Sequence, residues 1–263
     1  MSSLSQEKNI VIETAGSFDR NELIYPGGNI LSESATKKVH LTHDNMSIFS
    51  KKSIFFQKRN SFIATGNVHV KQGDSINLFC DSLNYDGLTR KFSSYGSVKF
   101  INDEMELNSN VLFFDRNANE IYFDKNGKII DSASTIKSKE GKYLINEKKY
   151  EFKKNVIVEN PDYKIRSDMM DYFLDSEITL FYKYSTIITA DYTIFCNEGF
   201  YDPQKKIGVF KKDAKINSET RTIFGDSIFF DENKKYASAS RNIKIIDEKE
   251  NLIIRGEYAE VFE

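Results

Sequence analysis

The sequence predicts an all-β fold of antiparallel strands, arranged as two-strand repeats of about 29 residues in two facing sheets. Three observations support this prediction. Gly66-Asn67-Val68 returns thirty residues later as Gly96-Ser97-Val98, apolar residues alternate with polar ones, and the chain holds 21 Phe and 14 Tyr but only three Pro. An aromatic-rich, proline-poor composition is typical of β-strands.

Two interleaved series of residues define the repeat. The first series lies at the Val68 position of each repeat and comprises Val68, Val98, Ile129, Val156, Thr186, Ala214 and Ile243. The second series marks the end of an aromatic strand and comprises Gln57, Asp86, Asp115, Asn146, Asp175, Asp202 and Asp231. Their steps of 27 to 31 residues keep the two series in phase. We therefore expect one elongated domain over residues 1–263, with about eight repeats and a longer, irregular first unit at residues 1–45.

Within a repeat, apolar residues recur at every second position, which is the period of a strand with one buried face. Residues 62–71 show the pattern first, and residues 152–158 repeat it. Turn signals such as Gln72-Gly73-Asp74 and Asn160-Pro161-Asp162 follow these strands. Strands of about eleven residues joined by such short turns must be antiparallel neighbours, which argues against a parallel β-helix.

Each long strand carries a poor strand former near its middle. Glycine, asparagine and aspartate inside strands mark bulges or bends, and here they are Gly66 and Gly96 in one strand type and Asp81, Asn110, Asn197 and Asp226 in the other. A flat sheet of some sixteen strands would be unusual. We therefore expect every strand to bend at the same level, so that two facing sheets enclose a long apolar trough.

Charge and targeting signals exclude several classes of protein. Lys and Arg number 37 against 39 Asp and Glu, so the basic excess that drives nucleic-acid binding is absent and no nucleic-acid partner is expected. Residues 1–8 lack the apolar core of a secretory leader, and no run of eighteen apolar residues predicts a membrane-spanning helix. Cys80 and Cys196 hold the same place in repeats four units apart, beyond the reach of a disulfide, so we expect two buried thiols.

No catalytic or metal-binding pattern stands out. His40 and His43 lie three apart, and residues three apart in a strand face opposite sides, so we interpret both as exposed polar residues. The acids that follow the aromatic strands lack the spacing of calcium-binding β-rolls and are interpreted as turn residues: Asp86, Asp115, Asp202 and Asp231. The sequence thus predicts no enzyme, no cofactor and no metal.

The recurring sequence motif resembles that of a known family. Gly-Asn-Val-x-Val, then Asp81-Ser-Leu83-Asn-Tyr85-Asp86 and a lysine-rich turn, is similar to the OstA-like family, the periplasmic lipopolysaccharide-transport proteins of the LptA type, from about Asn9 to Phe262. The resemblance implies a V-shaped, open β-jellyroll whose groove shelters the acyl chains of lipopolysaccharide or lipid A. It also implies a periplasmic location and edge strands that join copies head to tail, or join other jellyroll components, to bridge the inner and outer membranes.

The groove that this resemblance implies would be lined by the inward-facing residues of the repeats: Ala64, Val68, Val70, Leu83, Tyr85, Val98, Phe100, Leu112, Phe114, Phe152, Val156, Val158, Ile228 and Phe230. Three later repeats lack the Gly-Asn-Val motif, so they are expected to pack differently. At this position they read Lys128-Ile129-Ile130, Ser185-Thr186 and Asp213-Ala214. The last strand, Tyr258 to Phe262, is expected to offer a free edge.

Two other classes of function stay open. A structural or adhesive repeat protein would have a closed core filled by its own side chains and would bind no lipid. A polysaccharide-active enzyme on a β scaffold would need clustered acids with Arg or Lys on one concave face, whereas this sequence offers regularly spaced turn acids.

Overall fold

The structure is a computed structural model that describes residues 9–262. Residues 1–8, in which the sequence lacks a leader core, lie outside the described part, as does Glu263. The described residues form 24 strands and two single-turn 3-10 helices, Gln57–Arg59 and Ile145–Glu147. Over this range no helix has the length and apolar character needed to cross a membrane.

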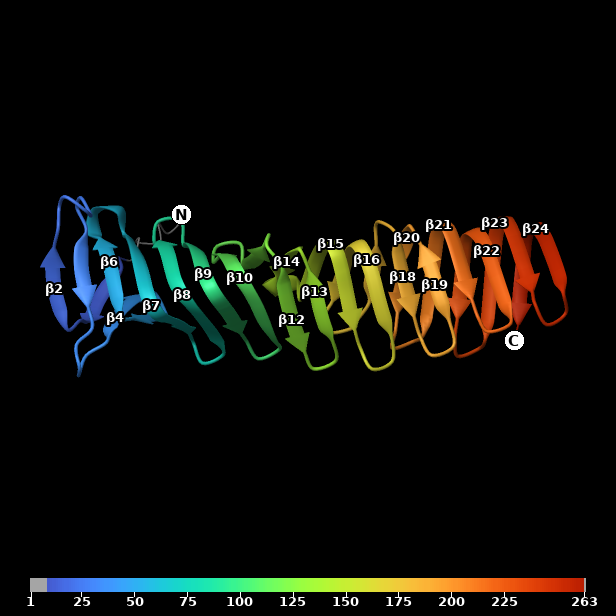
Figure 1. The fold of residues 1–263 in the computed structure, drawn as a ribbon, viewed down its shortest axis with the longest axis horizontal. Coiled ribbons are helices and arrows are strands. Elements are labelled where there is room, and N and C mark those ends of the chain that lie inside the picture. Colours follow the sequence, from blue (N-terminus) through green and yellow to red (C-terminus); the bar gives the residue numbers. More distant parts are fainter. Residues whose placement is uncertain (1–8, 263) are drawn as a thin grey trace, which may run out of the picture. The chain divides into compact units, whose positions relative to one another are not determined.

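The strand contacts group the chain into two compact units, Met1–Ser132 and Ala133–Glu263, and each is described by itself. The strands of the first unit are β1 (Val11–Thr14), β2 (Ser17–Arg20), β3 (Asn29–Ser32), β4 (Val39–His43), β5 (Met46–Ser50), β6 (Lys52–Phe56), β7 (Ser61–Gln72), β8 (Ile76–Asp86), β9 (Lys91–Ile101), β10 (Met105–Asp115), β11 (Glu120–Phe123) and β12 (Gly127–Asp131). Figure 1 shows β7 to β10 running in alternating directions.

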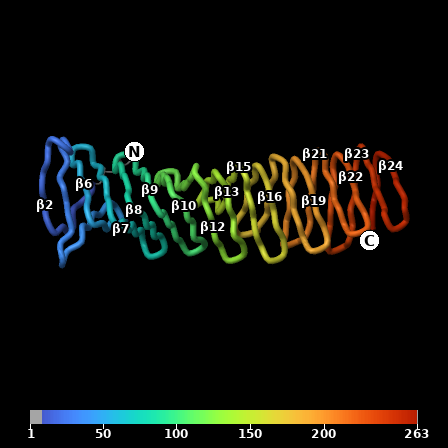
Figure 2. The backbone as a smooth tube through the Cα atoms, viewed as in Figure 1, coloured from blue at the N-terminus to red at the C-terminus, as the bar shows by residue number. Residues whose placement is uncertain are grey.

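The second unit repeats this plan. Its strands are β13 (Thr135–Ser138), β14 (Glu140–Leu144), β15 (Lys149–Glu159), β16 (Lys164–Phe173), β17 (Thr179–Phe181), β18 (Ser185–Ile188), β19 (Thr193–Cys196), β20 (Glu198–Asp202), β21 (Ile207–Asn217), β22 (Arg221–Asp231), β23 (Tyr236–Asp247) and β24 (Leu252–Phe262). The backbone trace of this unit shows successive strands joined by turns of similar shape (Figure 2).

Every long strand contributes to two hydrogen-bonded ladders. The first half of β7, residues 61–65, pairs with β6, whereas its second half pairs with β5. We call the ladder that contains β6 ladder A and the ladder that contains β5 ladder B. In the second unit β15 likewise pairs with β14 in ladder A and with β13 in ladder B. The pairings within each unit are antiparallel, as the short turns predicted.

The two ladders meet at a corner made by two consecutive left-handed residues. At the first corner φ is 78° for Gly66 and 47° for Asn67, and at the second it is 74° for Gly96 and 45° for Ser97. In the second unit the same conformation recurs without glycine, at Lys154-Asn155, Lys212-Asp213 and Arg241-Asn242. The predicted bends at Gly66 and Gly96 are therefore confirmed.

The partner strands break register at the same level. The pairing is irregular across Phe79–Ser82, Ser109–Val111 and Phe224–Ser227, segments that contain Asp81, Asn110 and Asp226. Asn197 separates β19 from β20, which splits that arm into two short strands. All four predicted poor strand formers of the second type thus lie where the ladder is interrupted, and the all-β, antiparallel prediction is confirmed.

Three predictions about single residues are wrong. His40 is half-buried and not exposed, because its ring stacks on that of Phe49 with ring centroids 4.4 Å apart. His43 is buried with 3% of its surface exposed, and its Nδ1 lies 2.6 Å from the Tyr85 hydroxyl, so a polar partner across the interior replaces water.

Thr186 was assigned to the buried Val68 position, but Ser185 is the fully buried residue there. Ser185 pairs with Cys196 and bonds the Ser167 hydroxyl at 2.8 Å, which makes a small polar contact tolerable in the core.

Candidate functional site

The candidate site is the apolar interior between ladder A and ladder B. All fourteen residues predicted to line a groove lie there, each with at most 6% of its surface exposed. In the first unit they are Ala64, Val68, Val70, Leu83, Tyr85, Val98, Phe100, Leu112 and Phe114, and in the second unit they are Phe152, Val156, Val158, Ile228 and Phe230. The prediction that these side chains face inward is therefore met, whereas contact with a lipid stays a prediction.

Side chains of the two ladders touch each other across this interior. In the first unit Phe100 of ladder B meets Phe114 of ladder A edge to face, with ring centroids 6.4 Å apart. In the second unit the Tyr192 ring meets Phe230 at 4.7 Å in the same geometry. A cavity lined by Tyr192, Ile216 and Phe230, among others, measures only about 10 Å³, the space of about one water molecule.

The sequence-based list missed further interior residues. Leu78, Phe92 and Leu107 in the first unit and Ile165 and Phe210 in the second are buried just as deeply. The period-two alternation could have found all five, because each lies an even number of positions from a residue that faces inward on the same half-strand.

Opposite the corners, the turns of ladder A face the turns of ladder B, and we call this side the mouth. In the first unit Arg116, in the turn after β10, is buried at the mouth, with 4% of its side chain exposed. Its Nε donates to the Gln72 Oε1 at 3.2 Å, and its Nη2 donates to the Asn45 Oδ1 at 3.3 Å. These bonds join the edge of ladder A to that of ladder B.

Further polar contacts surround Arg116. Its Nη1 donates to the Tyr85 hydroxyl at 3.2 Å and lies 3.7 Å from the Asp44 Oδ2. The same Asp44 oxygen accepts a 2.5 Å bond from the Arg90 Nη2. Burial raises the pKa of the Tyr85 hydroxyl, and the nearby Arg116 charge partly opposes that rise. The hydroxyl therefore stays protonated near neutral pH.

The mouth of the second unit is bridged by different groups. The Tyr163 hydroxyl donates to the Glu177 Oε2 at 2.9 Å, and burial is the main cause of the raised pKa of Tyr163. The Arg221 Nη2 donates to the Asp247 Oδ2 at 2.7 Å, which lowers the pKa of that carboxyl, and its Nη1 donates to the carbonyl of Phe262 at 3.2 Å. Both units therefore carry polar bridges where the interior would open.

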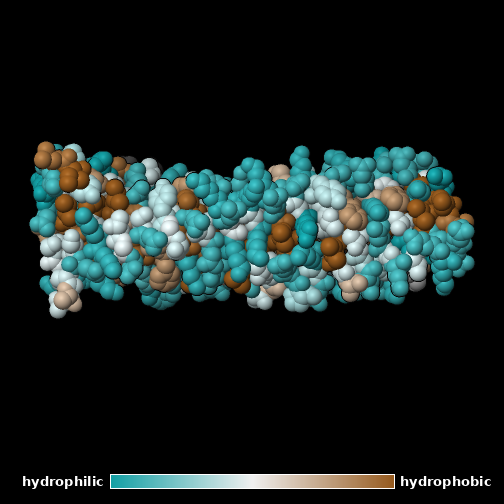
Figure 3. Space-filling model, in the orientation of Figure 1, coloured by the Kyte–Doolittle hydropathy of each residue, from teal (hydrophilic) through white to brown (hydrophobic). Residues whose placement is uncertain are grey.

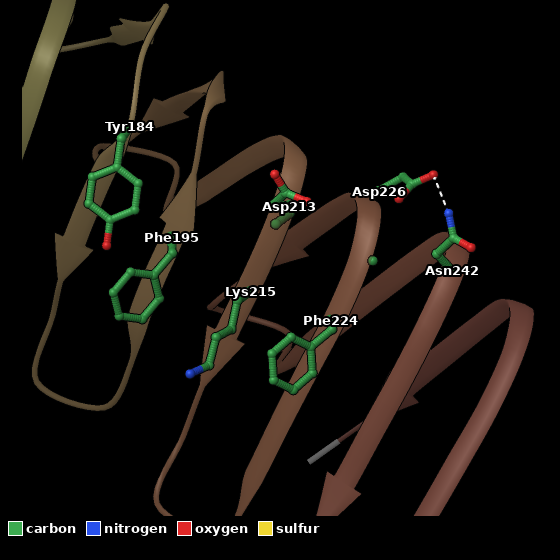
Figure 4. Close-up of a pocket in the computed structure, with 9 residues that line it drawn as sticks. Tyr184, Phe195, Asp213, Lys215, Phe224, Asp226 and Asn242 are labelled. Carbon is green, nitrogen blue, oxygen red and sulfur yellow. Dashed lines mark hydrogen bonds between the residues drawn. The ribbon is translucent and has the colours of Figure 1, made fainter.

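A second depression lies on the outer face of the second unit, near the corner. It measures about 470 Å³ and is shown in Figure 4. Phe195, Lys215 and Phe224 lie on strands and Tyr184 directly precedes β18. The other labelled residues, Asp213, Asp226 and Asn242, lie at the bends. The Lys215 ammonium lies 5.3 Å from the Phe195 ring centre and 5.4 Å from that of Phe224. The Asn242 amide donates to Asp226 at 2.9 Å. These polar groups hold one another at the surface.

The turn acids behave as turn residues. The Asp86 Oδ1 accepts from the backbone N–H groups of Leu88 and Thr89 at 2.9 and 3.2 Å, and Asp115 does the same for Asn117 and Ala118. Asp202 and Asp231 also accept such a bond, from the residue three positions later. Between residues 9 and 262 no group of three His, Cys, Asp or Glu side chains is placed to hold a metal ion.

Three comparisons relate the chain to known proteins. The family model of the OstA-like protein matches residues 7–168, which is more than half of the 263 residues. No protein of curated function matches the chain. Among solved structures, LptH of Pseudomonas aeruginosa, described as the LptA homologous periplasmic component of the conserved lipopolysaccharide transport device, is 14% identical; the match has a TM-score of 0.36 and covers 40% of this chain and 79% of LptH.

Proposed function

The chain belongs to the OstA-like protein family, and on that premise we propose that it is a periplasmic lipopolysaccharide-binding and transport protein. In this proposal, acyl chains lie between ladder A and ladder B. The observation that carries the proposal is the apolar interior of each unit, to which all fourteen predicted groove residues contribute.

Acyl burial supplies the driving force. Each CH₂ group transferred from water contributes about 0.8 kcal/mol, so a chain of about twelve carbons gains roughly 10 kcal/mol before ordering costs. Because the inner side chains already touch, as Phe100 and Phe114 do, the ladders must move apart to admit the chain. That movement breaks side-chain contacts between the ladders and the bridges at the mouth, whereas the hydrogen bonds within each ladder can be kept.

We further propose that β24 pairs with a strand of a second copy, or of another jellyroll component, to form a bridge between the two membranes. Within the described residues β24 hydrogen-bonds β23 along one edge. The large apolar side chains of β24 are 45% to 67% exposed: Leu252, Ile253, Ile254, Tyr258 and Phe262. Figure 3 shows apolar surface at this end of the second unit. An exposed strand edge with apolar side chains is suited to strand addition.

A binding titration with a fluorescent lipid A tests the transport proposal. We expect saturable binding by the wild type and at least about tenfold weaker binding by Val98→Asp and Val156→Asp, because a carboxylate in the interior opposes acyl burial. Ile157→Asp is the matched control, since Ile157 neighbours Val156 but faces outward and is only half-buried. Circular dichroism must show each variant folded, and Val156→Thr serves as a milder variant if an aspartate prevents folding.

The second candidate is a structural or adhesive repeat protein with a closed core. Contact across the interior and the bridges at both mouths favour it. In the titration, well-folded wild-type protein that takes up no lipid A would support this candidate and contradict the transport proposal.

A further inference from the structure

The mouth of the first unit brings two guanidinium groups to one carboxylate. Arg90 and Arg116 both contact the Asp44 Oδ2, at 2.5 and 3.7 Å. The two arginines belong to turns of ladder A, whereas Asp44 lies in the β4–β5 turn of ladder B. The carboxylate that holds the two edges together is thus also the anion that the guanidiniums share.

Arginine is suited to exchange one anion for another. Its planar fork of donors matches carboxylate and phosphate equally well in geometry, and it stays charged at every physiological pH. A phosphate carries more negative charge than a carboxylate and offers more acceptor oxygens, so it can engage both guanidiniums at once. Asp44 is reachable from water, with 20% of its side chain exposed, and the side chain of Arg90 is 39% exposed.

The position of the cluster determines what kind of phosphate would reach it. An amphiphile whose acyl chains lie between the ladders would hold its headgroup at the mouth. Resting on the proposed function, we propose that Arg90, Arg116 and Asp44 form a headgroup gate: the phosphate of an acylated ligand displaces Asp44 from the two arginines. Loss of the Asp44 contacts weakens the bridge between the ladders, so that of the Arg116 bonds across the mouth only the neutral ones to Gln72 and Asn45 still have to break before ladder B can move away from ladder A.

The remaining bonds of Arg116 fit this role. Gln72, Asn45 and the Tyr85 hydroxyl are neutral partners of its guanidinium, so they orient it without neutralising its charge. When a phosphate takes the place of Asp44, these neutral groups can keep the buried side chain in position. Among the described contacts at the mouth of the second unit, no two arginines share one carboxylate; Arg221 alone is joined to Asp247.

The test compares fluorescent diphosphorylated lipid A with its dephosphorylated counterpart. We expect the wild type to bind the phosphorylated probe about tenfold more tightly, the gain of one charge-assisted interaction. Arg116→Gln should abolish this preference, and Asp44→Asn should increase it, because the competing carboxylate is gone. Arg59→Gln is the matched control, since Arg59 is exposed and lies over the Phe56 ring, and it should behave as the wild type.

Several outcomes would overturn the gate. A bridge that only holds the fold together would change the affinity for both probes equally in Arg116→Gln and Asp44→Asn. An equal affinity of the wild type for both probes would also contradict the gate while leaving the transport proposal intact. Absence of saturable binding of either probe would contradict the transport proposal itself. If Arg116→Gln does not fold, Asp44→Asn still decides, since it is expected to change the preference in the opposite direction.

Calorimetric titration with inorganic phosphate separates a lipid headgroup from free phosphate. We expect inorganic phosphate to bind at least about a hundredfold more weakly than the phosphorylated probe, because it brings no acyl surface to bury. Equal affinities would identify a site for free phosphate and overturn the assignment to a headgroup.

Discussion

At the scale of single residues, each corner is made by two consecutive residues with positive φ. Glycine adopts a positive φ freely, and asparagine tolerates it. Lys154, Lys212 and Arg241 occupy the same conformation, with φ between 57° and 65°, at a cost of about 1 kcal/mol or more each. The neighbouring antiparallel pairs on both sides of each corner offset that cost.

Gly96→Ala tests the corner at this scale. We expect it to lower the free energy of unfolding by about 1–2 kcal/mol, because φ is 74° and an added Cβ would overlap the Asp81 carboxylate. Gly225→Ala is the matched control: Gly225 has no positive φ, and the nearest atom to an added Cβ is 3.5 Å away. Urea denaturation gives both values, and equal effects of the two substitutions would contradict this account of the corner.

At the scale of elements, the turns at the end of the aromatic strands combine a local cap with an ion pair. Asp115 uses Oδ1 to accept two backbone N–H groups and Oδ2 to pair with the Lys91 ammonium at 2.9 Å. The bond to Lys91 is the main reason that the pKa of Asp115 lies below its ordinary value of 3.8. The turn of β10 is thereby tied to the first residue of β9.

The pH dependence of stability tests this ion pair. Because the pKa of Asp115 is lower in the folded chain than in the unfolded chain, its contribution to stability is fully present above the unfolded pKa and is lost as the pH falls through the folded pKa. Asp115→Asn keeps an acceptor for the turn but loses the pair. We expect its urea midpoint to lie below that of the wild type at about pH 6 and to approach it at about pH 2.5.

Lys91→Gln is the companion variant, because it removes the other partner and should reproduce the same convergence at low pH. A constant difference between wild type and Asp115→Asn across this pH range would show that the substitution acts through the turn and not through the charge.

Much of the element plan was predictable from sequence, and the exceptions have physical causes. The spacing of Gly66 and Gly96 gave the corners in the first unit, but Lys154-Asn155 and Lys212-Asp213 adopt the same torsion angles without the glycine on which that prediction depended. The predicted buried position was one residue too late, at Thr186 in place of Ser185, because neither side chain is apolar and the apolar pattern gave no signal there.

The mouth could not be predicted for a different reason. Arg116 follows the turn acid Asp115, and its partners Gln72 and Asn45 lie 44 and 71 positions away in the chain. No local sequence pattern indicates which turns of ladder B lie opposite which turns of ladder A. The fourteen inward-facing residues were predictable because a period of two fixes the face of a strand.

At the scale of the molecule, each unit contains one buried thiol. Cys80 lies in the interior of the first unit and Cys196 in that of the second, and both are unpaired, as predicted. Burial raises the pKa of each thiol to about 12. A thiol that is both inaccessible and protonated reacts slowly, so each cysteine reports on the opening of its own unit.

Thiol labelling at about pH 8 tests this. In Cys196→Ser the reagent can label only Cys80, so it reports on the first unit. In Cys80→Ser it can label only Cys196, so it reports on the second unit. We expect each native thiol to react at least about a hundredfold more slowly than in urea-unfolded protein, since reaction requires local or global opening. Fast labelling of Cys80 in the folded protein would show that the first unit opens readily without a ligand.

The corner of two consecutive left-handed residues has a consequence for how such a chain can change in length. Each corner is specified by its own two residues and by the strands directly beside it, so one copy of the motif makes no demand on copies farther along. Insertion or deletion of a whole two-strand repeat would leave every other corner intact. Length is therefore a property that evolution, or an engineer, can adjust in steps of about 29 residues without redesigning the rest.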